Sequence, residues 1–160
     1  MARFCLDTNV FIQSKNGPYS FDIFPAFWNF LDRQFIEDEI CSSLLVYDEL
    51  AKGNDELADW VQGRRKYFLE PDEVVQEQLS HIGDYVNDHQ QYSSSNRAAF
   101  LGCADPWVIA LAKSSQLTVV THEKLVPNNS KKVKIPNICN AFKVPYIDLY
   151  QMLRILNARF

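Results

Sequence analysis

Four acidic residues fall at positions from which they could act on one substrate. Asp7 directly follows the first apolar segment of the chain, and Glu123 comes two residues after another apolar segment. Glu49 follows a third such segment, and Asp105 begins the stretch that leads toward Glu123. If these segments are parallel strands, their carboxyl ends lie at one edge of a sheet, where ligand sites form. Carboxylate oxygens are the ligands that Mg²⁺ and Mn²⁺ prefer, so the spacing indicates a candidate metal site.

Each acid also has a purely structural interpretation. Asp105 precedes Pro106, which is the pattern of a helix N-cap followed by proline in the first turn. Asp7 precedes Thr and Asn and could equally be a cap or a turn former. Glu49 and Glu123, taken singly, have the character of exposed glutamates. A carboxylate has two oxygens, so capping and metal binding are compatible.

The elements that would position these acids alternate between short strands and helices. Strands are expected at 4–6, 40–42, 117–121 and 135–139. Helices are expected at 8–14, 24–35, 43–50, 55–61, 72–86, 105–112 and 147–156, with a loop at 93–96 and a turn at 128–130. The segment 117–121 is apolar and β-branched with no polar face, which is typical of a strand buried on both sides. This alternation predicts an α/β domain with a mostly parallel central sheet flanked by helices.

Charge and composition allow several partners. The net charge is −4 and the pI about 5.3, yet basic residues cluster at 64–66 and at 131–134. Each cluster could be a solvated face or a contact for phosphate. No segment has the length of a membrane span and a charge interrupts the N-terminus early, so we expect a soluble, cytoplasmic protein. The four cysteines form no C-x-x-C pair and are expected to be buried thiols.

Four motifs occur in the order known from PIN domains. They are Leu6-Asp7-Thr8-Asn9-Val10-Phe11-Ile12, Tyr47-Asp48-Glu49-Leu50, Ala104-Asp105-Pro106-Trp107-Val108-Ile109-Ala110 and Val119-Val120-Thr121-His122-Glu123. The chain therefore resembles the PIN-domain family. Three further segments, Phe21-Asp22-Ile23-Phe24-Pro25 with Phe27-Trp28, Gly53-Asn54-Asp55 and Thr121-His122-Glu123, resemble a bacterial PIN-like subgroup related to VapC-type toxins.

The resemblance implies a single three-layer PIN-like domain over residues 1–160. It implies that Asp7, Glu49 and Asp105 bind Mg²⁺ or Mn²⁺ and that Glu123 supports a second metal or a water. Asp48 is the alternative to its neighbour Glu49, which the x-E-L pattern of the family favours.

The resemblance also makes Asn9 and Thr121 candidate donors that orient the carboxylates. The implied activity is metal-dependent endoribonuclease, with RNA as substrate. The implied biological role is the toxin of a type II toxin–antitoxin pair, with a protein antitoxin as partner and a homodimer left open.

Two rival functions remain at this stage. A PIN-like module could bind RNA or protein without cutting, although the intact carboxylates count against it. A phosphoryl-transfer protein also places an aspartate at a strand end. A phosphatase of the haloacid-dehalogenase type would show Asp-x-Asp, whereas Asp7-Thr8-Asn9 lacks the second acid. A receiver domain would have an adjacent acidic pair early in the chain, and this sequence has none there.

Overall fold

The centre of the molecule is one sheet of five parallel strands. The computed structural model describes residues 1–160. Its strands are β1 Phe4–Leu6, β2 Ile40–Ser43, β3 Phe68–Leu69, β4 Thr118–Val120 and β5 Tyr146–Ile147. The strand order is β3-β2-β1-β4-β5, and every pairing is parallel. The carboxyl ends of all five strands therefore lie at one edge, with β1 in the middle.

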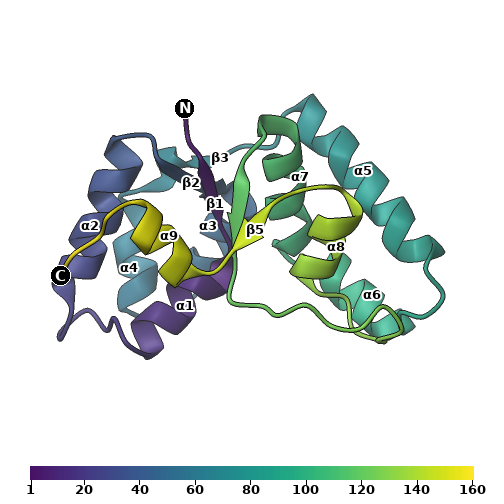
Figure 1. Cartoon of the computed structure of the whole chain (residues 1–160). Coiled ribbons are helices and arrows are strands. Elements are labelled where there is room, and N and C mark those ends of the chain that lie inside the picture. The colour runs from purple at the N-terminus through teal and green to yellow at the C-terminus, as the bar shows by residue number, and fades with distance from the viewer.

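Helices cover both faces of this sheet. Their bounds are α1 Thr8–Asn16, α2 Pro25–Ile36, α3 Leu44–Ala51, α4 Glu56–Gln62, α5 Glu73–Asp88, α6 Ser94–Leu101, α7 Asp105–Ser115, α8 Ile135–Ala141 and α9 Leu149–Ile155, with a 3-10 turn at Arg65–Tyr67. Figure 1 shows α2, α4 and α9 on one side of the strands and α5 to α8 on the other. Helix α7 packs on β1, β2 and β4, and α5 packs on α7. The three layers expected from the sequence are confirmed.

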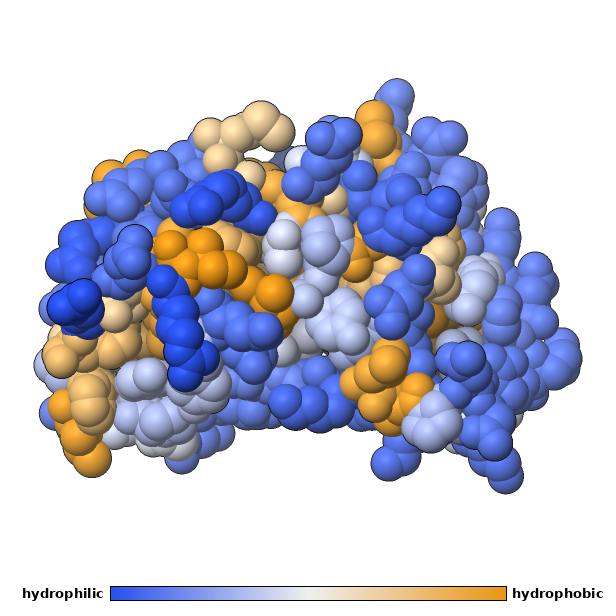
Figure 2. Space-filling model, viewed as in Figure 1, coloured by the Kyte–Doolittle hydropathy of each residue, from blue (hydrophilic) through white to orange (hydrophobic).

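One hydrophobic core joins the layers. A single cluster of 38 buried residues includes the whole of β1 and side chains from both helical layers. The face drawn in Figure 2 is largely hydrophilic, with hydrophobic residues in separate patches. No helix has both the length and the apolar character that crossing a membrane requires.

Most of the elements expected from the sequence are confirmed, because their caps and apolar runs act locally. Ser43, Asp55 and Asp72 cap α3, α4 and α5, each accepting a backbone N–H with its side chain. Pro25 occupies the first turn of α2, where its missing N–H costs nothing. Cys5, Cys41 and Cys139 are buried free thiols, as expected, and Cys103 is partly exposed.

Two expected elements are wrong. The polar run at 93–96 is not a loop, because Ser93 caps α6 by accepting the backbone N–H of Asn96 at 3.2 Å. The segment 135–139 is not a strand but lies in α8, with Pro136 in its first turn. The two-residue strands β3 and β5 were not predicted, and β5 takes the start of the expected helix 147–156. That helix begins instead at Leu149, where Asp148 and Gln151 form a capping box.

Candidate active site

Asp7 stands at the carboxyl end of the central strand. The main chain continues the pairing of β1 with β4 here, because the Asp7 N–H donates to the Val120 carbonyl at 3.0 Å. Helix α1 begins at the next residue, but the Asp7 side chain makes no capping hydrogen bond to it. The carboxylate is fully buried. The Asp7 side chain therefore lies at the carboxyl edge of the sheet without capping helix α1, which follows it.

Only one oxygen of the Asp7 carboxylate has a hydrogen-bond partner. Thr121, the residue that follows β4, donates from Oγ1 to Asp7 Oδ2 at 3.1 Å. The other oxygen, Oδ1, is buried and has no partner. A buried polar atom without a partner costs about 1–3 kcal/mol, so Asp7 is a poor choice for stability alone. An acceptor of this kind is suited to binding a cation.

Burial and neighbouring acids change the protonation of Asp7. Burial raises the pKa of Asp7, and the charges of Asp105 and Glu123 raise it further, to about 8. The hydrogen bond from Thr121 opposes this shift by favouring the charged form. Three acids from separate segments therefore lie close enough to influence one another.

Asp105 reaches the same region from the first turn of α7. The N-cap of this helix is Ala104, and Asp105 makes no capping hydrogen bond, so the sequence-based interpretation of Asp105 as a cap is wrong. Burial and then the charge of Glu123 raise the pKa of Asp105 to about 6. Glu49 raises this pKa as well, whereas the positive charge of Lys134 lowers it. Asp105 therefore lies within electrostatic reach of two other acids and of a lysine.

Glu49 is the best-anchored acid of the group. Its Oε1 accepts the backbone N–H of Ala104 at 2.7 Å, and its Oε2 accepts the Thr8 hydroxyl at 2.7 Å. Its neighbour Asp48 is exposed. Of the two adjacent acids, the structure thus directs Glu49 toward the residues around Asp7 and Asp105.

Glu123 lies on the segment that leaves β4. Its backbone N–H donates to Thr121 Oγ1 at 3.1 Å, so Thr121 bridges Glu123 to Asp7. Its side-chain Oε1 accepts the backbone N–H of Ile135, at the start of α8, at 2.9 Å. Glu123 is partly exposed. The segment after β4 is therefore fixed at both of its ends.

The two polar residues expected to orient the carboxylates differ in position. Thr121 is buried and donates to Asp7, whereas Asn9 is exposed on α1. No hydrogen bond of the Asn9 side chain is present. Donors that sequence reasoning missed do hold the acids, namely the Thr8 hydroxyl and the backbone N–H groups of Ala104 and Ile135. Thr8 could have been suspected from its place beside Asp7, but backbone donors leave no mark in a sequence.

The donor chemistry of this site fits a divalent cation, although its present side-chain positions do not form a cage. No group of three or more His, Cys, Asp or Glu side chains is arranged to hold a metal ion. Both oxygens of Glu49 and one oxygen of Glu123 are engaged by protein donors. Asp7 Oδ1, in contrast, accepts no hydrogen bond from the protein. It is a carboxylate oxygen, which is the type of hard ligand that divalent cations such as Mg²⁺ prefer. Asp7 is therefore the residue best placed to receive a cation.

A cleft opens beside Asp105 and Glu123. Its volume is about 380 Å³, and it is lined by Asn96, Ala99, Phe100, Cys103, Asp105, Glu123, Lys132, Val133 and Lys134. Burial and the charge of Asp105 raise the pKa of the Cys103 thiol to about 12. Cys103 is therefore a neutral thiol near neutral pH and a poor nucleophile. The acids, and not the cysteine, give this cleft its chemical character.

Comparison with family models places the chain in a family. Residues 4–160 match the model described as "Domain of unknown function (DUF4411)", and the chain belongs to that family. No curated protein sequence matches it.

Solved structures share the fold of this chain. VapBC2 from Rickettsia felis, bound to a DNA fragment from its promoter, is similar with a TM-score of 0.57 at 14% identity, over 92% of this chain and 98% of the other. DNA-bound VapBC from Salmonella typhimurium gives a TM-score of 0.53 at 20% identity, over 92% and 98%. FitAcB from Neisseria gonorrhoeae gives 0.50 at 21% identity, over 90% and 96%. At these identities the likeness establishes the fold, which is the PIN-like fold of VapC proteins.

Proposed function

We propose that this protein is a divalent-metal-dependent endoribonuclease and the toxin of a type II toxin–antitoxin pair. The observation that carries the proposal is the buried Asp7 carboxylate, which ends the central strand with one oxygen lacking any protein donor. Selection for stability alone would replace such a group, so its presence points to a ligand. A cytoplasmic location follows from a substrate of cellular RNA.

Each acid has a separate role in this proposal. Asp7, Glu49 and Asp105 hold the cation, and Glu123 supports a second cation or a water molecule. Mg²⁺ or Mn²⁺, when bound, would supply a water nucleophile at neutral pH and neutralise charge on the phosphate. Thr121 positions the Asp7 carboxylate through Oδ2, and Oδ1, which has no protein donor, would be available to a cation. Thr8 and the Ala104 N–H hold Glu49 in reach of the site.

The fold supports the biological part of the proposal. The similar structures are of VapBC and FitAcB assemblies, two of them with DNA. A protein antitoxin is therefore the proposed partner of this chain. A homodimer of the chain is compatible with binding of such a partner. RNA is the proposed substrate.

Cleavage of single-stranded RNA by the purified protein tests the activity. We expect cleavage with Mg²⁺ or Mn²⁺, none with EDTA, and a loss of at least about a hundredfold in Asp7→Asn, on the scale of removing a group that positions a catalytic ion. Asp48→Asn is the matched control, because Asp48 is an exposed acid beside Glu49, and it should cleave like the wild type. Undiminished cleavage by Asp7→Asn would identify the activity as a contaminant and remove the proposal.

A second candidate function is a PIN-like module that binds RNA or protein without cutting. The hydrogen bonds that occupy Glu49 and Glu123 favour it, because these acids already act as structural acceptors. The same assay separates the two functions. RNA that is bound but stays intact under every metal condition would favour the module over the nuclease.

A further inference from the structure

A basic segment forms one wall of the cleft beside the acids. Lys132, Val133 and Lys134 line this cleft together with Asp105 and Glu123. The residue after Lys134, Ile135, donates its N–H to Glu123 Oε1 at 2.9 Å, so this lysine lies beside one of the acids. Positive and negative side chains thus line the same cleft.

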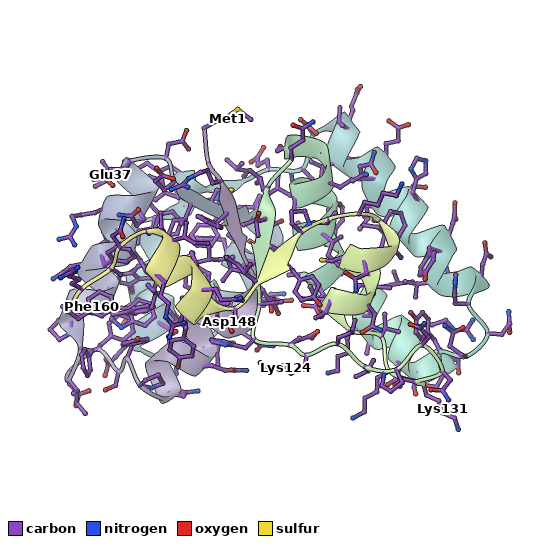
Figure 3. The ribbon with its side chains drawn as sticks, viewed as in Figure 1. Met1, Glu37, Lys124, Lys131, Asp148 and Phe160 are labelled. Atoms are coloured by element: carbon purple, nitrogen blue, oxygen red, sulfur yellow. The ribbon has the colours of Figure 1, made fainter.

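Hydrogen bonds hold this segment in place. Asn96 donates from Nδ2 to the Lys131 carbonyl at 2.8 Å, and the Ser93 N–H donates to the same carbonyl at 3.3 Å. Figure 3 shows the chain running from Lys124, below the sheet, to Lys131 on the side of the molecule where α6 lies. The bond from the Ile135 N–H to Glu123 then fixes the end of the segment. The backbone that carries Lys132 and Lys134 is therefore held by hydrogen bonds on both sides of these residues.

These lysines form no ion pair within the protein. The structure contains five ion pairs, and none of them involves Lys131, Lys132 or Lys134. The other basic cluster of the sequence differs, because Arg64 pairs with Asp32 and lies over the Trp60 ring at 4.4 Å. Arg64 therefore has a structural role, whereas the cluster at 131–134 is available to an anion.

We infer that Lys132 and Lys134 bind the phosphate backbone of a single-stranded RNA lying in this cleft, adjacent to the phosphate that a cation bound by the acids would engage. The inference rests on the proposed function and names the substrate path of that site. A polyanion that reaches the acids along this cleft is repelled by their carboxylates, and the lysines that line the same cleft offset this repulsion. A lysine ammonium serves a phosphate as a point charge.

The rest of the lining favours RNA over an acidic peptide. Ala99 and Val133, which are exposed and partly exposed, give the cleft apolar surface that a base can contact, and Asn96 adds a polar side chain. Single-strand sites combine such surfaces with a basic track for the backbone. A cation bound by Asp105 and Glu123 could also bind a phosphate of the RNA. Such a shared cation would position this phosphate next to the two carboxylates.

The test measures binding of a labelled single-stranded oligouridylate to Asp7→Asn protein, which is expected not to cut it, over a salt series. Each phosphate contact to a single strand contributes about 0.7 to the slope of log affinity against log salt. The double variant Lys132→Ala, Lys134→Ala should therefore have a slope that is less steep by about 1.4, and it should bind about 25-fold more weakly at about 0.1 M salt. Lys132→Arg with Lys134→Arg keeps the charges and should bind as tightly as the parent.

The matched control removes two lysines that lie away from the cleft. Lys66 and Lys113 are exposed, and neither lines the cleft, so Lys66→Ala with Lys113→Ala makes the same change in net charge. This control should retain the parent slope. An equal loss in the control would overturn the inference, because it would mean that net charge alone attracts the RNA.

The remaining outcomes separate the inference from the proposed function. The wild-type protein could cleave RNA while the lysine-to-alanine variant binds oligouridylate as tightly as its parent. This outcome would overturn the inference and support the proposed nuclease activity. Lysine-dependent binding without any cleavage by the wild type would keep the inference and overturn the nuclease. Lysine-dependent binding of oligoglutamate, with no binding of oligouridylate, would overturn the inference in favour of an acidic protein partner.

Discussion

Two acids of the same site differ in what the protein provides for them. Glu49 has a protein donor for each oxygen, whereas Asp7 is fully buried with one oxygen left without a partner. A satisfied buried acceptor stabilises the fold, and an unsatisfied one destabilises it. The two residues should therefore respond in opposite directions when their acceptors are removed.

Asp7→Asn should stabilise the metal-free protein by about 1 kcal/mol, because the buried carboxyl must either be protonated or carry a charge among other acids, whereas the amide is neutral at every pH. The effect should depend on pH. The folded pKa of Asp7 is raised to about 8 from an ordinary 3.8, so the folded state binds this proton more tightly than the unfolded chain does. The free energy of unfolding of the wild type should then fall as the pH rises from about 4 to about 8. Thermal melts in EDTA should show a larger advantage of Asp7→Asn at about pH 8 than at about pH 5.

The control for this measurement is Asp48→Asn, which removes one exposed negative charge. Its stability should stay within about 0.5 kcal/mol of the wild type at each pH. A clearly destabilised Asp7→Asn protein in EDTA would mean that the Asp7 carboxylate is structural, and the physical basis of the cation site would be lost.

At the scale of elements, Glu49 joins three helices at the edge of the sheet. It belongs to α3, accepts the hydroxyl of Thr8 in α1, and accepts the N–H of Ala104, the N-cap of α7. Few single side chains of this protein bond to two other elements at once. The site is therefore also a structural junction.

Glu49→Ala should lower the free energy of unfolding by about 2–3 kcal/mol, because it leaves the Ala104 N–H and the Thr8 hydroxyl without an acceptor. Glu49→Gln keeps one acceptor oxygen and should cost about half as much. Urea unfolding measures both, with Asp48→Ala as the neutral neighbour. Equal stabilities of Glu49→Ala and wild type would show that these two hydrogen bonds do not contribute in solution.

At the scale of the whole molecule, the cleft lined by Asp105 and Glu123 is the part of the acidic site that a partner protein could reach. A protein that inhibits an acidic metal site would insert Arg or Lys, since a guanidinium pairs with carboxylates and occupies the place of the cation. Metal and inhibitor would then compete for the same acids. The proposed antitoxin is the partner to which this competition applies.

Competition predicts that added Mg²⁺ weakens binding of the inhibitor to the wild-type protein. Mg²⁺ or Mn²⁺ should also raise the melting temperature of the isolated protein by mass action, and do so less for Asp7→Asn. Titration calorimetry of the complex at increasing Mg²⁺, at constant ionic strength, measures the first effect. Binding that tightens with Mg²⁺ would contradict the competition model and favour a ternary complex that includes the cation.

The sequence alone determined the elements that depend on local rules. The N-cap residues, the proline in the first turn of α2 and the apolar run of β1 each specify a structure within a few positions. The same local rules failed at Ser93, where a polar run was the cap of a helix, and at Pro136, where a short apolar run was ambiguous between helix and strand. Strands β3 and β5 have two residues each, too few to show any periodicity.

Tertiary structure alone decided which acids have unused oxygens. Four acids could be selected from the sequence, but the donors that bind them could not. These donors are the hydroxyls of Thr121 and Thr8 and the backbone N–H groups of Ala104 and Ile135. The two hydroxyls are distant in the chain from the acids they bind, and the other two donors belong to the main chain. Only the parallel pairing of β1 with β4 brings Thr121 beside Asp7. The sequence encodes the side chains of the site, whereas their burial and charge depend on contacts that exist only after the sheet has formed.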